Sequence, residues 1–392
     1  MDRYRSQYRN VHRRNPYIRL YHRGERALPR SPLPSHAGLE AWIEAKKALH
    51  SVYYRNPSIF RDAKTIVVVG GGPSGQDLVS DLLAAGKNVV HSVTGAARED
   101  LHDGRLKVRG RIARYGSLET GHLAFEDGSE ESAVDRAALA TGYKFDFPFF
   151  PAEVLRTSVP PPVPPLPGAL YNSTYHAFPL GKHIFPLVSA DEFPSSTVAF
   201  LGLPIRVAPL PLLEAQMRAV LHVFEHPESL DPTQEAIDIV SRYEALRARI
   251  VRGRASASSP SKPKPPLGGE EIDLGDLDLD TAPGLTAADG RVELAIASAW
   301  HRFDGHEQFA YRDALHGLSG AGHRVAGWEV EMYDAKGVLR EEWRDLERLG
   351  EAGEWVKGVG AGEGEEGTKE WVELMRRLLR RAEERHHELS RL

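Results

Sequence analysis

A short apolar run followed by a glycine cluster constrains the fold of this chain more than any other feature. Residues Thr65–Val69 read Thr-Ile-Val-Val-Val, and the cluster that follows consists of Gly70, Gly71, Gly72, Pro73, Ser74 and Gly75. A β-branched apolar run bounded by glycine is typical of a buried parallel strand. Pro73 to Ala85 then reads as a helix, with proline in its first turn and Gly86 just past its end. The pattern predicts a strand–turn–helix unit of a parallel α/β sheet.

The glycine spacing is the one that a dinucleotide pyrophosphate requires. Gly70 allows the tight turn, Gly72 lets the backbone approach the phosphates, and Gly75 lets the helix pack on the strand. The helix that begins near Pro73 adds roughly half a positive charge at its N-terminus. We therefore expect the turn, with Gln76 directly after it, to bind a dinucleotide. The competing interpretation is a glycine turn in an ordinary strand–helix unit.

The end of the next predicted strand, Asn88–Ser92, bears on which dinucleotide binds. An NAD site usually places an acidic residue about 20 residues after the turn, where it holds the ribose hydroxyls. That position falls near His91 and Ser92, and no acid follows until Glu99. The absence favours NADP, with Arg98 and His91 as candidates for contacting the 2′-phosphate. The alternative for Arg98 is a solvated surface arginine.

Further elements follow from hydrophobic periodicity and turn residues. A short helix and its exit are expected at Glu40–Tyr54. Strands are expected at Leu106–Tyr115, His122–Glu126, Ala137–Ala140 and Thr197–Leu201, and helical segments at Leu212–Glu225, Val292–Leu318 and Thr368–Leu392.

Composition excludes several classes of function. The chain has no cysteine, which rules out disulfides, thiolate metal sites and cysteine nucleophiles. Its histidines, such as His50, His183 and His301, are too scattered to predict a metal site. A net charge of -5 gives no reason to expect nucleic acid, and no run approaches the roughly 20 apolar residues of a membrane span. A cytoplasmic location is expected, and the oligomeric state is left open.

Four segments stand out in a fixed order along the chain. The first is His50–Pro57, and the second is Thr65–Asp77, which holds the glycine turn. The third, Leu139–Tyr143, reads Leu-Ala-Thr-Gly-Tyr, and the fourth consists of two runs, His183–Pro186 and Val198–Pro204. Together they resemble the flavin-containing monooxygenases. The first two are similar to the NADPH-binding half of that family, the third to its motif where the chain crosses back toward the flavin domain, and the fourth to its downstream flavin-domain segment. The likeness runs from about Pro34 to His226, with a weaker echo at Gln308–Tyr311, and adds Thr141, Gly142 and Tyr143 to the expected cofactor contacts.

The resemblance implies an enzyme with NADP(H) and FAD as cofactors. Members of the family reduce FAD with NADPH, let the reduced flavin react with O2, and oxygenate a soft nitrogen or sulfur nucleophile of a small molecule. The cofactor carries this chemistry while the protein binds and orients it, so no catalytic side chain is named.

The chain departs from the family pattern in three places. The family begins with a separate strand–glycine turn–helix for FAD, but 64 residues precede Thr65 here and none forms a G-x-G-x-x-G motif. In the family's F-x-G-x-x-x-H-x-x-x-Y/F motif His50 and Tyr54 fit, whereas Glu44 and Lys46 stand in the Phe and Gly places. The family's arginine for the 2′-phosphate would fall near Thr94. The expectation is an N-terminally truncated monooxygenase chain; the alternative is a non-catalytic NADP-binding or interaction protein derived from the family.

The expected fold is α/β, a Rossmann-type NADP-binding lobe plus an incomplete FAD-binding lobe. The prolines between Pro160 and Pro167 predict a stiff extended connector rather than an SH3-type ligand. The expected divisions are a basic, poorly ordered arm at 1–35, a remnant of the FAD lobe with a connector at 36–61, the NADP-binding lobe at 62–143, an FAD-lobe segment with the proline-rich connector at 144–250, a flexible linker at 251–290, a helical FAD-lobe segment at 291–350 and a C-terminal helix at 351–392.

Overall fold

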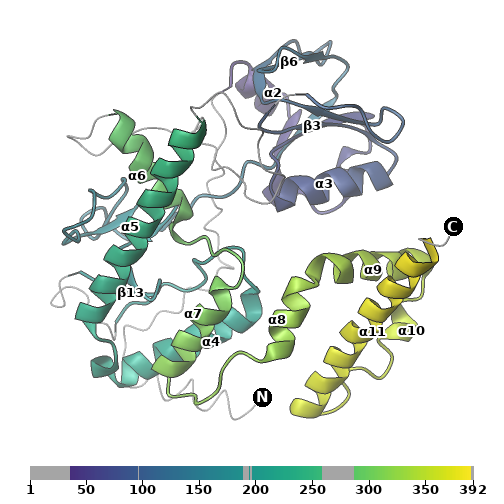
Figure 1. Ribbon diagram of the computed structural model, residues 1–392. Helices are drawn as coiled ribbons and strands as arrows, with labels where there is room; N and C mark the ends of the chain where they lie inside the picture. The colour runs from purple at the N-terminus through teal and green to yellow at the C-terminus, as the bar shows by residue number, and fades with distance from the viewer. Residues whose placement is uncertain (1–35, 96, 189–193, 195–196, 258–286, 390–392) are drawn as a thin grey trace. The chain divides into compact units, whose positions relative to one another are not determined.

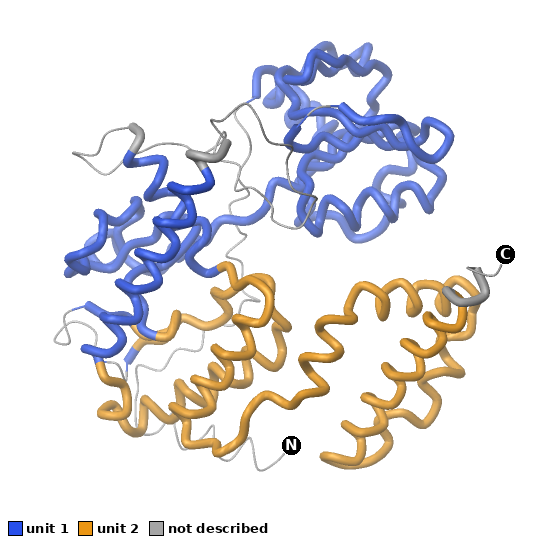
Figure 2. The backbone as a smooth tube through the Cα atoms, in the orientation of Figure 1, with its two compact units in different colours: residues 1–181, 186–197, 232–301 blue, residues 182–185, 198–231, 302–392 orange. Residues whose placement is uncertain are grey.

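The computed structural model describes residues 36–95, 97–188, 194, 197–257 and 287–389 (Figure 1). The basic arm at 1–35 and residues 258–286 of the expected linker lie outside the described residues. The chain divides into two compact units, one of residues 1–181, 186–197 and 232–301 and one of residues 182–185, 198–231 and 302–392 (Figure 2).

A five-stranded parallel sheet forms the centre of the first lobe of unit 1. The strand order is β1-β8-β2-β3-β4, and every neighbouring pair is parallel. The bounds are Ala48–His50 for β1, Thr65–Val69 for β2, Asn88–Ser92 for β3, Leu106–Arg109 for β4 and Arg136–Leu139 for β8. Because the chain runs outward from β2 through β3 to β4 and then returns to β8 on the other side of β2, the strand order reverses beside β2. Ligands of open α/β sheets bind outside the carboxyl ends of strands at such a reversal.

Side chains alternate between the two faces of β2 and so build two separate cores. Ile66 and Val68 pack with Leu78 and Leu82 of helix α3 (Pro73–Ala84). On the other face Val67 belongs to a core covered by helix α2 (Leu39–Glu44) and by a small antiparallel sheet. That sheet has the order β5-β6-β7, with bounds Ile112–Tyr115, Leu123–Phe125 and Glu130–Glu131. The lobe is thus a three-layer, Rossmann-type α/β structure, as expected.

Two details of this lobe differ from the sequence interpretation. The run Leu106–Tyr115 is not one strand, because β4 ends at Arg109 and β5 begins at Ile112 in the other sheet. Strand β1 was not expected at all, and it pairs with β8 at the edge of the parallel sheet. Residues 36–61 therefore contribute α2 and β1 to this lobe, and the boundary expected at residue 62 lies inside it.

The rest of unit 1 combines short strands with two helices. Strands β9 (Leu155–Arg156), β10 (Leu170–Asn172) and β11 (Ala177–Phe178) form one small sheet, and β12 spans Leu180–Gly181. Helices α5 (Pro232–Ala257) and α6 (Ala287–Trp300) pack through a core that contains Tyr243, Ile296 and Trp300. These helices extend into both ends of the segment expected as a linker at 251–290, so the described part of that segment is helical.

Unit 2 consists mainly of helices. Their bounds are Pro209–Glu225 for α4, Glu307–Leu318 for α7, Gly327–Asp334 for α8, Lys336–Leu349 for α9, Ala352–Trp355 for α10 and Glu365–Leu389 for α11. Short elements elsewhere are β13 (Phe185–Pro186) and the 3-10 turns η1 (Ser51–Tyr53), η2 (Pro57–Phe60) and η3 (Pro227–Ser229). The expected helical segment Val292–Leu318 is interrupted, since α6 ends at Trp300 and α7 begins at Glu307.

The expected strand Thr197–Leu201 is not formed. The Phe200 N–H donates to the Ile184 carbonyl oxygen at 2.8 Å, and the Gly202 N–H donates to Gln216 Oε1 at 2.9 Å. An apolar run without a ladder of such bonds stays a loop. The last helix is present, and it begins at Glu365 rather than at Thr368.

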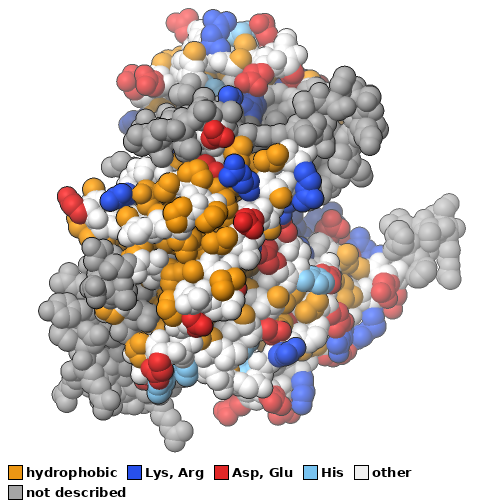
Figure 3. Space-filling model, turned by 60° about the vertical axis from the view of Figure 1, so that its left-hand side comes forward, with side chains coloured by type: hydrophobic (Ala, Val, Ile, Leu, Met, Phe, Trp, Pro, Cys, Tyr) orange, Lys and Arg blue, Asp and Glu red, His pale blue; other side chains and the backbone are white. Residues whose placement is uncertain are grey.

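Large hydrophobic side chains also reach the surface of both units. In unit 2, α4 exposes Leu210, Met217 and Leu221, and in unit 1, α5 exposes Ile237 and Val251. Figure 3 shows hydrophobic side chains gathered in the middle of one face of the molecule.

Candidate functional site

The glycine turn lies where the sequence predicts it, between the carboxyl end of β2 and the first turn of α3. Gly70 has φ +117°, and a Cβ on it would lie 2.3 Å from the Ala140 carbonyl oxygen. A Cβ on Gly75 would lie 1.9 Å from the Gly70 carbonyl oxygen. Both distances are far below van der Waals contact, so the turn closes against β8 and against α3 only when these two positions lack side chains.

The backbone beyond Gly70 is open toward a ligand. A Cβ on Gly72 would meet nothing within 4 Å. Gly72 is the N-cap residue of α3, and no side chain caps the helix there. The first N–H groups of a helix need such partners, and an anion at the N-terminus can supply them. Gln76 Nε2 donates to the Gly71 carbonyl oxygen at 3.1 Å and so holds the turn from the helix side. These residues fit a pyrophosphate.

The His91 side chain bonds the backbone of the glycine turn and does not face a ligand phosphate. Its Nε2 donates to the Gly70 carbonyl oxygen at 3.0 Å. Burial lowers the pKa of His91, the Gly70 carbonyl opposes that effect, and the positive charge of Arg98 lowers the pKa further. A neutral imidazole is therefore favoured at neutral pH, which makes His91 a hydrogen-bond donor without a charge to offer a phosphate.

Arg98 lies in the loop that follows β3. This loop turns back along β4, because the Arg98 N–H donates to the Val108 carbonyl oxygen at 3.1 Å and Leu101 pairs with Leu106. The Arg98 side chain is exposed, and it is close enough to His91 for its charge to affect that ring. The structure thus places the Arg98 backbone along β4, the strand next to β3, with its charge in reach of His91 on β3.

The Thr-Gly-Tyr motif follows β8 at the same edge of the sheet. Gly142 has φ +85°, and Tyr143, whose side chain is 52% exposed, packs edge-on against the ring of His50 with centroids 5.7 Å apart. His50 ends β1, which pairs with β8, and its Nδ1 accepts the Val52 N–H at 3.2 Å. Burial lowers the pKa of His50, and the Gly142 backbone partly offsets that shift. Two motifs far apart in the sequence therefore meet beside the glycine turn.

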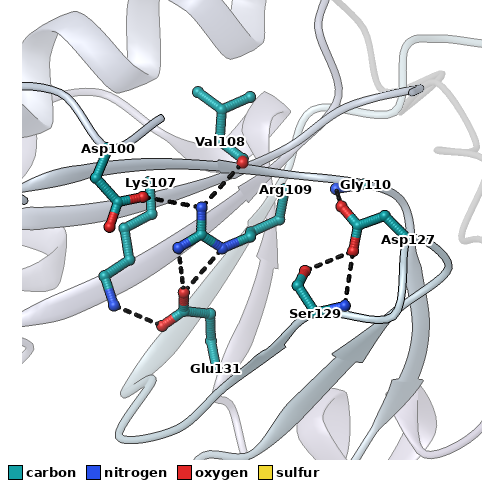
Figure 4. A network of polar contacts seen from close by, with 8 residues as sticks. All are labelled: Asp100, Lys107, Val108, Arg109, Gly110, Asp127, Ser129 and Glu131. Atoms are coloured by element: carbon teal, nitrogen blue, oxygen red, sulfur yellow. Dashed lines mark hydrogen bonds and ion pairs between the residues drawn. The ribbon is translucent and has the colours of Figure 1, made fainter. Parts of the chain in front are cut away.

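A polar network next to the Arg98 loop was missed by the sequence analysis (Figure 4). Arg109, at the end of β4, bonds Glu131 through Nε at 2.9 Å and Nη2 at 2.8 Å, and Asp100 through Nη1 at 2.9 Å. Asp127 accepts the Gly110 N–H at 2.5 Å and the Ser129 N–H at 2.9 Å. Asp127 and Gly128 directly follow the expected strand His122–Glu126, and an Asp-Gly pair in that place is typical of a turn. Nothing local in the sequence shows what the Asp127 carboxylate binds.

No other chemistry stands out in the part of the chain that the structure describes. Within it, no group of three or more histidine or carboxylate side chains could hold a metal ion. Likewise, no described helix is long and apolar enough to cross a membrane.

Comparisons with known proteins lead to flavin-dependent monooxygenases. A sequence model of the family described as flavin-binding monooxygenase-like matches residues 98–259. A flavin-containing monooxygenase of Arabidopsis thaliana, FMO GS-OX-like 9, is 29% identical over 231 residues, which cover 56% of this chain and 44% of the relative. The thiol-specific monooxygenase of Saccharomyces cerevisiae is 28% identical over 207 residues, which cover 51% of this chain and 44% of the relative. The chain thus spans less than half the length of these relatives.

A solved structure supports the same fold. The S-allyl-L-cysteine S-oxygenase of Allium sativum superimposes with a TM-score of 0.51 at 22% identity, over 80% of this chain and 56% of that one. The match of residues 98–259 to the family model and the curated relatives lead to one conclusion: this chain is similar to the flavin-containing monooxygenases over about half of its length.

Proposed function

We propose that the β2–α3 junction binds the pyrophosphate of NADPH. The observation that carries the proposal is the turn itself, where Gly70 and Gly75 close against backbone oxygens while Gly72 faces open space at an uncapped helix N-terminus. The turn stands at the strand reversal of a parallel sheet, the usual place for a dinucleotide. Thr141, Gly142 and Tyr143, at the end of neighbouring β8, would contact the same cofactor.

We further propose that this chain contributes its NADPH-binding lobe to a flavin-dependent monooxygenation in which NADPH supplies the electrons. FAD, when bound, supplies the O2 chemistry that oxygenates a soft nitrogen or sulfur nucleophile. The name of the yeast relative, a thiol-specific monooxygenase, favours sulfur. Among residues 36–389, where described, β2–α3 is the one junction of strand, glycine turn and helix, so we assign it to NADPH and assign no described residue to FAD. The relatives do not favour a non-catalytic role.

This assignment predicts a preference for NADP over NAD. Arg98 adds a positive charge near the end of β3, where no acidic side chain stands to hold ribose hydroxyls. Replacing Arg98 with alanine should weaken NADP binding roughly tenfold, as expected for a lost charge-assisted hydrogen bond, and leave NAD binding unchanged. Calorimetric titration of both dinucleotides measures the two affinities.

The matched control for this measurement is Arg105→Ala. Arg105 is also exposed, but it precedes β4 at the opposite end of the sheet, where its Nη1 donates to the Leu83 carbonyl oxygen at 3.3 Å. The Arg105→Ala variant should leave the affinities for NADP and NAD unchanged. Equal loss of NADP and NAD binding in the Arg98 variant would remove Arg98 from the site, and tighter NAD than NADP binding in the unaltered chain would contradict the NADPH assignment.

A cytoplasmic location remains a prediction.

A further inference from the structure

Three segments meet at the carboxylate of Asp127. Its oxygens accept the N–H of Gly110 after β4, the N–H and hydroxyl of Ser129 in its own turn, and the backbone N–H of Ala97 in the loop after β3. Burial alone would raise the pKa of Asp127, but these hydrogen bonds outweigh it and lower the pKa. The carboxylate is therefore ionised at neutral pH, and charge-assisted bonds from several donors hold it in one place.

The backbone around Gly110 leaves room for this carboxylate and little else. A Cβ on Gly110 would lie 2.8 Å from Asp127 Oδ2 and 3.0 Å from the Gly95 carbonyl oxygen. The loop after β3 is thus packed directly against the corner between β4 and β5. Ser92 closes the same corner from the strand, where its Oγ donates to the Gly110 carbonyl oxygen at 2.9 Å.

A second contact holds the far end of the same loop. Asp100 pairs with Arg109, whose guanidinium is itself fixed by Glu131 of β7 (Figure 4). Lys107 also pairs with Glu131 at 2.8 Å. The side chains of Arg109 and Glu131 are only 12% and 10% exposed, so this pair is rigid compared with an ordinary surface ion pair. The loop is anchored at Ala97 by Asp127 and at Asp100 by Arg109, one residue before Arg98 and two residues after it.

We propose that Asp127 and Arg109 are positioning residues for recognition of the 2′-phosphate of NADP, because they fix the loop that carries Arg98. The inference rests on the proposed NADPH site. A solvated arginine on a mobile loop would lose conformational entropy when it binds a phosphate. Two anchors on the small antiparallel sheet and on β4 remove most of that loss before the ligand arrives. The meander β5–β7, which stands where such folds often have a helix, would thereby contribute to cofactor choice.

The test compares two small nucleotides that bind without flavin or turnover. Adenosine 2′,5′-bisphosphate carries the 2′-phosphate, and 5′-AMP lacks it. Replacing Asp127 with asparagine removes one acceptor for the backbone N–H groups and should weaken binding of the bisphosphate roughly tenfold. Binding of 5′-AMP should change by less than about twofold. A residue that merely stabilises the lobe would weaken both nucleotides equally, so the ratio of affinities is the readout.

A second pair of variants covers the case in which Asp127→Asn does not fold. Asp100 is more exposed, at 39%, and its removal leaves the Arg109–Glu131 pair intact. Asp100→Asn should lower the affinity ratio several-fold, and Asp100→Glu, which keeps the charge, should restore most of it. The control is Glu130→Gln, which removes an exposed ion pair with His122 beside Glu131 without touching the loop.

The possible outcomes distinguish the positioning role of Asp127 and Arg109 from the NADPH site itself. If the unaltered chain binds the bisphosphate more tightly than 5′-AMP and the Asp127 and Asp100 variants lose that difference, the positioning role is supported. If the unaltered chain shows the difference and folded variants keep it, the positioning role is wrong while the NADPH site stands. If the unaltered chain binds both nucleotides equally, recognition of the 2′-phosphate and its positioning by this loop are both overturned.

Discussion

Replacing Gly75 with alanine is expected to abolish NADP binding, with a loss of roughly 100-fold or more. A methyl group at this position would lie 1.9 Å from the Gly70 carbonyl oxygen, which is backbone and cannot rotate away. The helix must then move off the strand, and both the turn and the N-terminus of α3 lose their positions. Overpacking of this kind costs about 1–3 kcal/mol, so the melting temperature of the lobe should fall as well. Titration with NADP and thermal unfolding measure the two effects.

The Gly72→Ala variant separates an effect on NADP binding from an effect on the stability of the fold. Its Cβ would meet no protein atom within 4 Å, and Gly72 has φ -71°, which any residue adopts. The free energy of unfolding should therefore change by less than about 0.5 kcal/mol, whereas NADP binding should weaken because the methyl group occupies the space that the phosphates approach. Gly168→Ala, another open position, should change neither quantity. Unaltered NADP binding in both the Gly75 and Gly72 variants would show that the cofactor binds elsewhere.

The second large effect concerns flavin. The 392-residue chain is expected to purify without stoichiometric FAD and not to oxidise NADPH when an amine or a thioether is added. A second pyrophosphate needs a second uncapped helix N-terminus after a glycine turn, and the described residues contain one such junction, which we assign to NADPH. The 64 residues before β2 contain no glycine motif of this spacing. Leu210, Met217 and Leu221 on α4 are exposed apolar side chains. Apolar surface of this kind is expected where the flavin-binding lobe is incomplete.

Visible absorption of the purified protein measures its FAD content, and the rate of NADPH loss measures its oxidase activity; together they test this prediction. Tight binding of adenosine 2′,5′-bisphosphate by the same preparation is the control that the nucleotide lobe is folded. A yellow preparation that NADPH bleaches and air restores would contradict the prediction, because it would show that this chain holds FAD through residues that the glycine pattern does not reveal.

The sequence was most informative where structure depends on neighbouring residues. The run Thr65–Val69, the glycines after it and Pro73 predicted β2, the turn and α3, because backbone sterics and capping act within a few residues. The same local rules failed for Thr197–Leu201. That run has the composition of a strand, but a strand forms only where another segment completes its hydrogen bonds.

Contacts between distant segments were decided by the tertiary structure alone. Strand β1 is three residues long, and its place in the sheet comes from pairing with β8. The sequence indicated Arg98 by the absence of an acid after β3, but it did not indicate Asp127 or Arg109, since nothing near them in the chain shows that they hold the Arg98 loop. Local patterns determined that the chain has a dinucleotide turn, because the requirements of that turn are local. Side-chain contacts across the fold determined how the adjoining loop is held, because such contacts exist only once the sheets have assembled.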